Sequence, residues 1–232
     1  AARGLPTISA LITVFDVVTG LPLAVMNGAP VTATRTAAMA LLAARHLARS
    51  DSATLGLVGA GVQARSHYVA FRAEFPLARV LVVGRNPANV ERLVEEIRAD
   101  GVAAEAADAA TMLAEADLVA SSVPHTPGFE PFLDARLLRP GTFVGACDQG
   151  RSWRRDGLAG LDRILIDDLA QEHEAVAHGA PMVEAARIDG DLAALVGGDS
   201  APRRHEGERL GFVFRGMALA DLAAAALVMA AA

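Results

Sequence analysis

Leu55-Gly-Leu-Val-Gly-Ala-Gly-Val-Gln-Ala64 is the most informative segment of this chain, because a short apolar run leads directly into a glycine-rich turn. The pattern G-x-G-x-x-A begins at Gly59, continues at Gly61 and ends at Ala64. Between a strand and a helix, such glycines permit a tight turn and let the backbone approach a pyrophosphate, while the small last residue packs the helix on the strand. The free N–H groups of the helix start favour phosphate. The segment therefore predicts a dinucleotide site, with a plain tight turn as the alternative.

Short apolar segments alternate with helical ones on the C-terminal side of this motif. We expect a helix at 86–99 and strands at 55–58, 80–83, 102–106, 117–121, 141–146 and 163–166. Apolar strands that do not alternate with polar residues are typical of a parallel sheet covered by helices on both faces. The predicted fold class is therefore α/β, with a doubly wound parallel sheet of Rossmann type.

The two ends of the chain differ from this central part. Before the motif we expect a strand at 8–15, a turn at 19–20, a strand at 23–26, a tight turn at Asn27-Gly28, and a helix that Thr32 caps and that runs to about Arg49. The glycine- and charge-rich stretch 197–209 is the only plausible linker, and a helix from about 216 ends the chain. We divide the chain into 1–49, a nucleotide-binding part at 50–212, and a C-terminal helical part at 213–232.

Charge and residue usage exclude several function classes. The 232 residues include 21 basic and 27 acidic ones, so the net charge of −6 argues against general nucleic-acid binding. All 21 basic residues are arginine, which excludes any mechanism that needs a lysine within this chain. Cys147 is the single cysteine, so an intramolecular disulfide framework and a cysteine-based zinc site are excluded.

Metal binding and membrane insertion are not expected either. The histidines show no metal-ligand spacing, and the acids at 167–174 fit the first turn of a helix better than a metal site. The longest apolar run, 222–232, has 11 residues, whereas a spanning helix needs roughly 20. No signal-peptide pattern opens the sequence, so we expect a soluble cytoplasmic protein.

The end of the strand at 80–83 is the position that selects the cofactor. An acidic residue there binds the ribose 2′-hydroxyl of NAD, whereas an arginine accommodates the 2′-phosphate of NADP. Arg85 and Asn86 follow this strand, and no acid does. We predict a preference for NADP(H), with NAD(H) possible; a solvated arginine on a turn is the alternative.

Two residues are candidates for catalysis. Arg35 stands near the start of the expected helix, where a guanidinium and free N–H groups together suit an anion, although an ordinary surface arginine fits the spacing too. Asp148 follows the strand at 141–146, at the edge where open α/β sheets bind ligands. It is a candidate general acid or base, with a turn or cap residue as the alternative. Cys147 beside it fits a packed thiol, since the sequence places no base next to it.

Taken together, these features resemble the ornithine cyclodeaminase/mu-crystallin family. The resemblance rests, in family order, on Thr19-Gly-Leu-Pro-Leu-Ala24, Arg35-Thr-Ala-Ala38, the glycine motif at 59–64, the segment 145–148, and Gly216-Met-Ala-Leu-Ala-Asp221. It implies a Rossmann domain inserted into a second, smaller α+β domain, which both chain ends build and which serves substrate binding and dimerisation. A homodimer is implied as well.

The resemblance also implies roles for single residues. Arg35 would bind the substrate carboxylate, and Asp148 would donate or accept a proton at the substrate carbon. The expected cofactor contacts are Thr36, Gly59, Gly61, Val62, Gln63, Arg85, Asn86 and Ser122. Relatives carry a longer N-terminal segment with a catalytic lysine and a second substrate-binding arginine, so the sequence as given resembles a truncated chain.

The activity that this resemblance implies is hydride transfer between NADP(H) and the Cα atom of a small amino or cyclic imino acid, as in ketimine reductases. A cyclodeaminase that converts ornithine to proline and ammonia without net cofactor consumption is one alternative. A non-catalytic, crystallin-like NADPH-binding protein is the other, and the absence of lysine is its best support.

Overall fold

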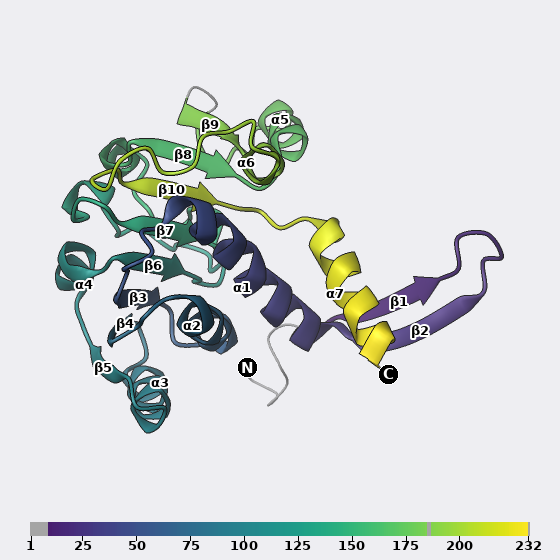
Figure 1. The fold of residues 1–232 in the computed structure, drawn as a ribbon, viewed down its shortest axis with the longest axis horizontal. Coiled ribbons are helices and arrows are strands. Elements are labelled where there is room, and N and C mark those ends of the chain that lie inside the picture. The colour runs from purple at the N-terminus through teal and green to yellow at the C-terminus, as the bar shows by residue number, and fades with distance from the viewer. Residues whose placement is uncertain (1–8, 185–186, 232) are drawn as a thin grey trace.

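The computed structural model describes residues 9–184 and 187–231, and a parallel sheet of eight strands forms its centre (Figure 1). The strand order is β5-β4-β3-β6-β7-β10-β8-β9, and every neighbouring pair is parallel. This confirms the α/β class with a Rossmann-like sheet. The strands are β3 (Thr54–Val58), β4 (Arg79–Val83), β5 (Ala103–Ala106), β6 (Leu118–Ser121), β7 (Phe143–Ala146), β8 (Arg163–Ile166), β9 (Ile188–Asp191) and β10 (Leu210–Val213).

Two apolar cores lie on the two faces of this sheet. Along β4, Val80 and Val82 pack into one core and Leu81 into the other, as alternation along a strand requires. The first core also contains residues of α1 (Gly28–Leu47), α2 (Val62–Glu74), α3 (Pro87–Ala99) and α6 (Leu192–Gly197). The second contains residues of α4 (Ala109–Glu115), η1 (Ala135–Leu137) and η2 (Asp156–Gly160). The sheet is thus covered on both faces, which explains its continuous apolar strands.

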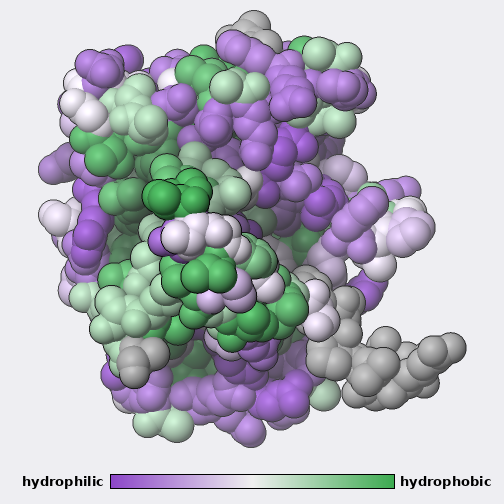
Figure 2. All heavy atoms as spheres, turned by 90° about the vertical axis from the view of Figure 1, so that its right-hand side faces the viewer, coloured by the Kyte–Doolittle hydropathy of each residue, from purple (hydrophilic) through white to green (hydrophobic). Residues whose placement is uncertain are grey.

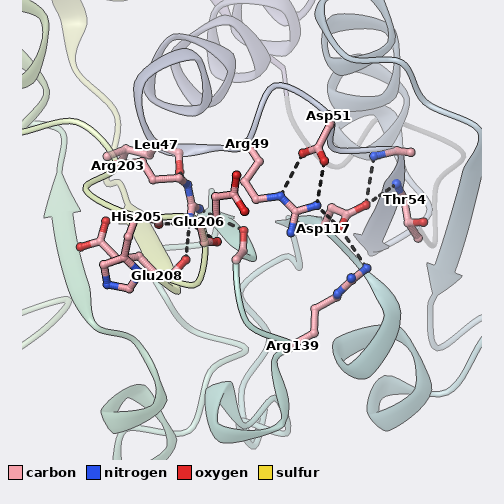
Figure 3. A network of polar contacts seen from close by, with 12 residues as sticks. Leu47, Arg49, Asp51, Thr54, Asp117, Arg139, Arg203, His205, Glu206 and Glu208 are labelled. Atoms are coloured by element: carbon pink, nitrogen blue, oxygen red, sulfur yellow. Dashed lines mark hydrogen bonds and ion pairs between the residues drawn. The ribbon is translucent and has the colours of Figure 1, made fainter.

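The stretch 197–209, predicted as a linker, is instead fixed to the body of the protein (Figure 3). Arg203 donates from Nε to the carbonyl of Leu47 at 2.9 Å and from Nη2 to that of Gly141 at 3.0 Å. Glu208 is buried and pairs with Arg163 at 3.2 Å. The stretch leads into β10, which lies between β7 and β8 and which the sequence analysis did not predict, and β9 was missed as well. Two of the four residues in β9 are aspartates, and β10 directly follows the charged stretch 197–209, so neither segment gave a strong strand signal.

A hairpin and two helices extend from the sheet. The hairpin consists of β1 (Leu11–Phe15) and β2 (Pro22–Asn27), and α7 (Ala218–Ala231) lies beside α1 near it (Figure 1). The predicted tight turn at Asn27-Gly28 is wrong, because the Asn27 Oδ1 accepts a hydrogen bond from the Ala29 N–H at 3.0 Å and caps α1. The helix therefore begins at Gly28 rather than near Thr32, since asparagine suits a helix N-cap as well as a turn. Within the described ranges, no helix is long and apolar enough to cross a membrane.

Candidate nucleotide-binding site

A cavity of about 710 Å³ opens at the carboxyl ends of β3, β4 and β6. This is the edge at which open α/β sheets bind ligands. Its lining includes one cation, Arg85, and no aspartate or glutamate among the described residues. The lining residues are Val58, Gly59, Ala60, Gly61, Val83, Gly84, Arg85, Asn86, Asn89, Ser122, Val123, Pro124, Thr126, Phe129 and Phe132.

The glycine turn forms one wall of the cavity, and its two glycines have different surroundings. Gly59 has a φ of +107°, and a Cβ atom there would lie 3.1 Å from the Ser122 carbonyl oxygen. Gly61 is extended, with a φ of −104°, and a Cβ atom there would meet nothing within 4 Å. Directly after it α2 begins, so the first N–H groups of the helix, from Val62 and Gln63 on, have no carbonyl partner within the helix. Open space next to these donors fits a pyrophosphate.

Arg85 and Asn86 also line the cavity, and they directly follow the end of β4. The Asn86 side chain serves as the N-cap of α3, because its Oδ1 accepts a hydrogen bond from the Asn89 N–H at 3.3 Å. Arg85 is exposed, and within the described residues no hydrogen bond or ion pair holds its guanidinium. A cation without an acidic partner at this position suits a 2′-phosphate better than a ribose hydroxyl.

Arg35 lies outside the cavity lining, where α1 meets α7. Its Nε donates to the Asp221 Oδ1 at 3.0 Å, and a Cβ atom at Gly216 would lie 2.9 Å from its Nη1. Asp221 therefore holds the guanidinium close to the Gly216 backbone, and within the described chain neither Nη group donates a hydrogen bond. Thr36, the next residue, is buried in the helix and does not line the cavity. Asp221 was part of the sequence resemblance, but nothing in the sequence alone paired it with Arg35.

Asp148 is buried, with 3% of its surface exposed. Its Oδ1 accepts from the Ser121 hydroxyl at 3.2 Å and its Oδ2 from the Ser152 hydroxyl at 2.5 Å, while the Trp153 Nε1 donates to the Ser121 Oγ at 3.0 Å. Burial raises the pKa of the Asp148 carboxyl above its ordinary value, and the hydrogen bonds from Ser152 and Ser121 offset only part of this rise. Asp148 does not line the cavity.

Cys147 has a partner that sequence reasoning missed. Its Sγ lies 2.9 Å from the His67 Nε2, and the His67 Nδ1 lies 2.7 Å from the Gln63 carbonyl oxygen. A carbonyl only accepts, so Nδ1 carries the proton and Nε2 accepts from the thiol. Burial lowers the pKa of His67 to about 4 and raises that of Cys147. The pair is therefore neutral near pH 7, as a packed thiol should be, and Cys147 and His67 stand 80 positions apart in the sequence.

The acids at 167–174 serve the structure around α5 (Leu169–Ala177). The Asp168 Oδ1 accepts from the Gln171 N–H at 3.0 Å and caps this helix, while the fully buried Glu172 pairs with Arg215 at 2.9 Å. Across residues 9–184 and 187–231, no three His, Cys, Asp or Glu side chains lie together in a way that suits a metal ion.

Comparison with known proteins places this geometry in a family. Ketimine reductase mu-crystallin of Mus musculus is 32% identical over 227 residues, which cover 96% of this chain and 69% of that protein. The structure of Thermococcus litoralis Delta(1)-pyrroline-2-carboxylate reductase in complex with NADH and L-proline matches 99% of this chain and 73% of its own, with 26% identity and a TM-score of 0.86. An archaeal alanine dehydrogenase dimer with bound NAD matches 99% of this chain and 72% of its own, also with 26% identity and a TM-score of 0.86. The model of the ornithine cyclodeaminase/mu-crystallin family matches residues 1–232, and the chain belongs to this family.

Proposed function

We propose that this protein is an NAD(P)-dependent oxidoreductase that acts on a small amino or cyclic imino acid, in the manner of a ketimine reductase. The observation that carries the proposal is the cavity at the glycine turn, where Gly61 leaves open space beside the start of α2. Similar proteins support the substrate class, since one relative in sequence is a ketimine reductase and one match in structure holds NADH together with L-proline. The bound nicotinamide supplies or accepts the hydride, and the protein supplies position and charge.

In this proposal Arg35 binds the substrate carboxylate. Its two Nη groups are the remaining donors of a guanidinium whose Nε is already held by Asp221, so the side chain is oriented before an anion arrives.

Reduction of an imine also needs a proton at nitrogen, and we assign the holding of this proton to Asp148. Its raised pKa supports that role, because a buried carboxyl keeps its proton closer to neutral pH than an exposed one. Ser121 and Ser152 fix its orientation.

We further propose that NADP(H) is preferred over NAD(H), which is also accommodated. The support is Arg85, together with the absence of an acidic side chain from the described lining. Isothermal titration calorimetry of the chain with NADPH and NADH tests it. We expect Arg85→Ala to weaken NADPH about tenfold or more while sparing NADH, as loss of a charge-assisted contact to phosphate predicts. Arg45→Ala is the matched control, since Arg45 pairs with Glu74 on the exposed side of α1. Tighter binding of NADH than of NADPH contradicts the proposal.

Turnover separates the proposed reductase from its alternatives. We expect one NADPH to be oxidised for each cyclic imino acid, such as Delta(1)-pyrroline-2-carboxylate, that is reduced, followed by absorbance and by amino-acid analysis. Formation of proline from ornithine without net loss of NADPH identifies a cyclodeaminase instead. Binding of NADPH without turnover of any amino or imino acid identifies a non-catalytic binding protein.

Finally, we propose that residues 1–49 and the helix at 213–232 belong to a second domain through which two copies associate. A hairpin of two strands is only marginally stable in water unless further structure covers it. Apolar side chains stay exposed on β1–β2 and on α7, and Figure 2 shows hydrophobic surface gathered in the middle of this face. The exposed residues are Leu11, Phe15, Val17, Val18, Leu21, Leu23, Val25, Leu219, Leu222, Leu227, Val228 and Met229. The match to an alanine dehydrogenase dimer supports a second copy as the occupant of this face.

A further inference from the structure

A second pocket, of about 250 Å³, lies beyond the loop that carries Asp148. It is lined by the arginines Arg151, Arg155 and Arg215 and by no aspartate or glutamate of the described chain. The other lining residues are Pro131, Gln149, Gly150, Trp153, Leu158, Ala180, Pro181 and Met182. Trp153 and Met182 are buried, so apolar side chains as well as the arginines border the pocket.

Main-chain carbonyl groups hold these arginines in place. Arg215 donates from Nη2 to the Ala180 carbonyl at 2.9 Å, and Arg155 donates from Nη2 to the Pro181 carbonyl at 3.0 Å. Arg151 makes only long contacts, from Nη1 to the Val123 carbonyl at 3.4 Å and from Nη2 to the Gln149 Oε1 at 3.3 Å. These contacts use a small part of the donor capacity, since each guanidinium carries five N–H groups.

The positive charge of the pocket is only partly balanced. Glu172 lies behind Arg215 and pairs with it at 2.9 Å. Within residues 9–184 and 187–231 no ion pair involves Arg151 or Arg155, and Asp156 next to Arg155 pairs with Arg136 and Arg154 instead, at 3.1 Å in each case. The Arg215 Nε is buried and has no hydrogen-bond partner. A buried donor without a partner is costly, and the Arg215 guanidinium therefore has hydrogen-bonding capacity that its contacts with Glu172 and Ala180 do not use.

We propose that this pocket is a second ligand site, separate from the nucleotide cavity, that binds a small doubly charged oxyanion such as phosphate or a dicarboxylate. Planar guanidinium groups recognise such oxygens in pairs, and a volume of about 250 Å³ holds a small anion but no nucleotide. The pocket also adjoins the nucleotide cavity and the loop that carries Asp148. Arg151 contacts the Val123 carbonyl of the nucleotide cavity, and Gln149 and Gly150 directly follow Asp148. An anion held there stabilises the loop that positions Asp148.

The test measures binding of the anion to the 232-residue chain. Thermal unfolding is followed while sodium phosphate, or disodium succinate in a second arm, is titrated against sodium chloride of equal ionic strength. We expect the phosphate or succinate to raise Tm in a saturable manner that chloride does not reproduce. Arg155→Gln should weaken this effect about tenfold, the loss expected for one charge-assisted contact. Arg151→Gln is the second variant, because both side chains lie outside ion pairs and their replacement leaves the Arg215–Glu172 pair in place.

Two controls separate this site from the nucleotide cavity. Arg154→Gln removes a neighbouring arginine that binds Asp156 and does not line the pocket, so the anion effect should remain. Arg85→Ala removes the cation of the nucleotide cavity, and the effect should remain there too. A response that persists in both Arg155→Gln and Arg151→Gln, or that disappears in Arg85→Ala, overturns the proposal. The anion that raises Tm at the lower concentration identifies the preferred ligand as phosphate or a dicarboxylate. If neither anion gives a saturable rise in Tm, the proposal is overturned as well.

Discussion

Gly59 and Gly61 belong to the same turn, but the physical reason for glycine differs between them. We expect Gly59→Ala to cost about 1–3 kcal/mol of folding free energy, because an L side chain at its φ of +107° is strained and would press on Ser122. Gly61→Ala should fold with little loss of stability, because its φ of −104° suits alanine and nothing lies within 4 Å. Its methyl group would instead occupy the space of the pyrophosphate and weaken NADPH about tenfold or more. Urea unfolding and calorimetry measure the two effects separately.

Gly61→Ala is the more decisive of the two variants, because we expect it to weaken NADPH binding without changing the stability of the fold. If Gly61→Ala binds NADPH as tightly as the parent chain, the pyrophosphate does not lie at this turn. Arg45→Ala again serves as the control for handling and concentration, since Arg45 lies on the exposed side of α1.

Asp148 gives a prediction about pH. Burial raises its pKa in the folded protein, so the folded state holds this proton more tightly than the unfolded state does. The stability that this group contributes is present below the unfolded pKa and is lost as the pH rises through the folded pKa. Asp148→Asn removes that loss, because an amide has no charge to bury and still bonds both hydroxyls, accepting from one serine and donating to the other. We expect Tm of the variant relative to the parent to increase between pH 4 and pH 8, while turnover falls and NADPH binding is unchanged.

A difference in Tm between Asp148→Asn and the parent that stays constant with pH would show that this carboxyl does not titrate differently on folding. Loss of NADPH binding in the variant would assign Asp148 to cofactor binding rather than to proton transfer. Asp51→Asn is a suitable control, because Asp51 is an exposed carboxyl whose hydrogen bond with Arg49 lowers its pKa. Its contribution to stability is lost only as the pH falls below the ordinary value of 3.8, so its replacement should give a nearly constant difference in Tm between pH 4 and pH 8.

At the scale of elements, local patterns predicted most of the sheet but not its contacts. The strands around the glycine motif lie where continuous apolar runs stand, because burial on both faces leaves a strong signal. β10 was missed, because its four residues form a strand by pairing with β7 and β8, and no local pattern shows this pairing. The start of α1 was misplaced because Asn27 suits both a turn and a cap. The pairs Cys147–His67 and Arg35–Asp221 join distant segments, 80 and 186 positions apart, and no local pattern encodes such contacts.

The same scale explains why the apparent linker at 197–209 is ordered. Arg203 joins the end of α1, the entry to β7 and the entry to β10 through the carbonyls of Leu47, Gly141 and Glu208 (Figure 3). Burial lowers the pKa of its guanidinium below the ordinary value, but hydrogen bonds with carbonyl oxygens satisfy the charge. We expect Arg203→Ala to destabilise the protein by about 2–4 kcal/mol, since several buried acceptors lose their donor together. Urea unfolding measures the loss.

The neighbouring arginine is the control for this prediction. Arg204 is exposed, and within the described chain its main-chain N–H donates to the Glu208 Oε2 at 2.6 Å while its side chain makes no hydrogen bond or ion pair. Arg204→Ala should therefore leave stability within about 0.5 kcal/mol, as is usual for surface substitutions. Equal losses for the two variants would mean that the stretch 197–209 is stabilised by its backbone rather than by the Arg203 side chain.

At the scale of the whole molecule, polar and apolar surface are unevenly distributed. The net charge of −6 is modest for 232 residues, and the helices over the sheet carry exposed ion pairs such as Arg65–Glu96 and Arg72–Asp100. The hairpin and α7 instead expose apolar side chains over neighbouring elements (Figure 2). A large contiguous apolar surface of this kind marks an interface rather than a free face.

This surface leads to a prediction about the oligomeric state. We expect the chain to form dimers at micromolar concentration. Leu222 is 59% exposed in the single copy, and the proposed contact would bury it. Leu222→Glu should therefore shift the chain toward monomers, because it would place a charge in this apolar contact. Val69→Glu is the matched control, since Val69 is 64% exposed on α2, away from the hairpin, and should leave the dimer intact. Light scattering coupled to gel filtration gives the mass of each variant. A parent chain that stays monomeric at all concentrations, or a Val69→Glu variant that dissociates as readily as Leu222→Glu, would contradict association through this face.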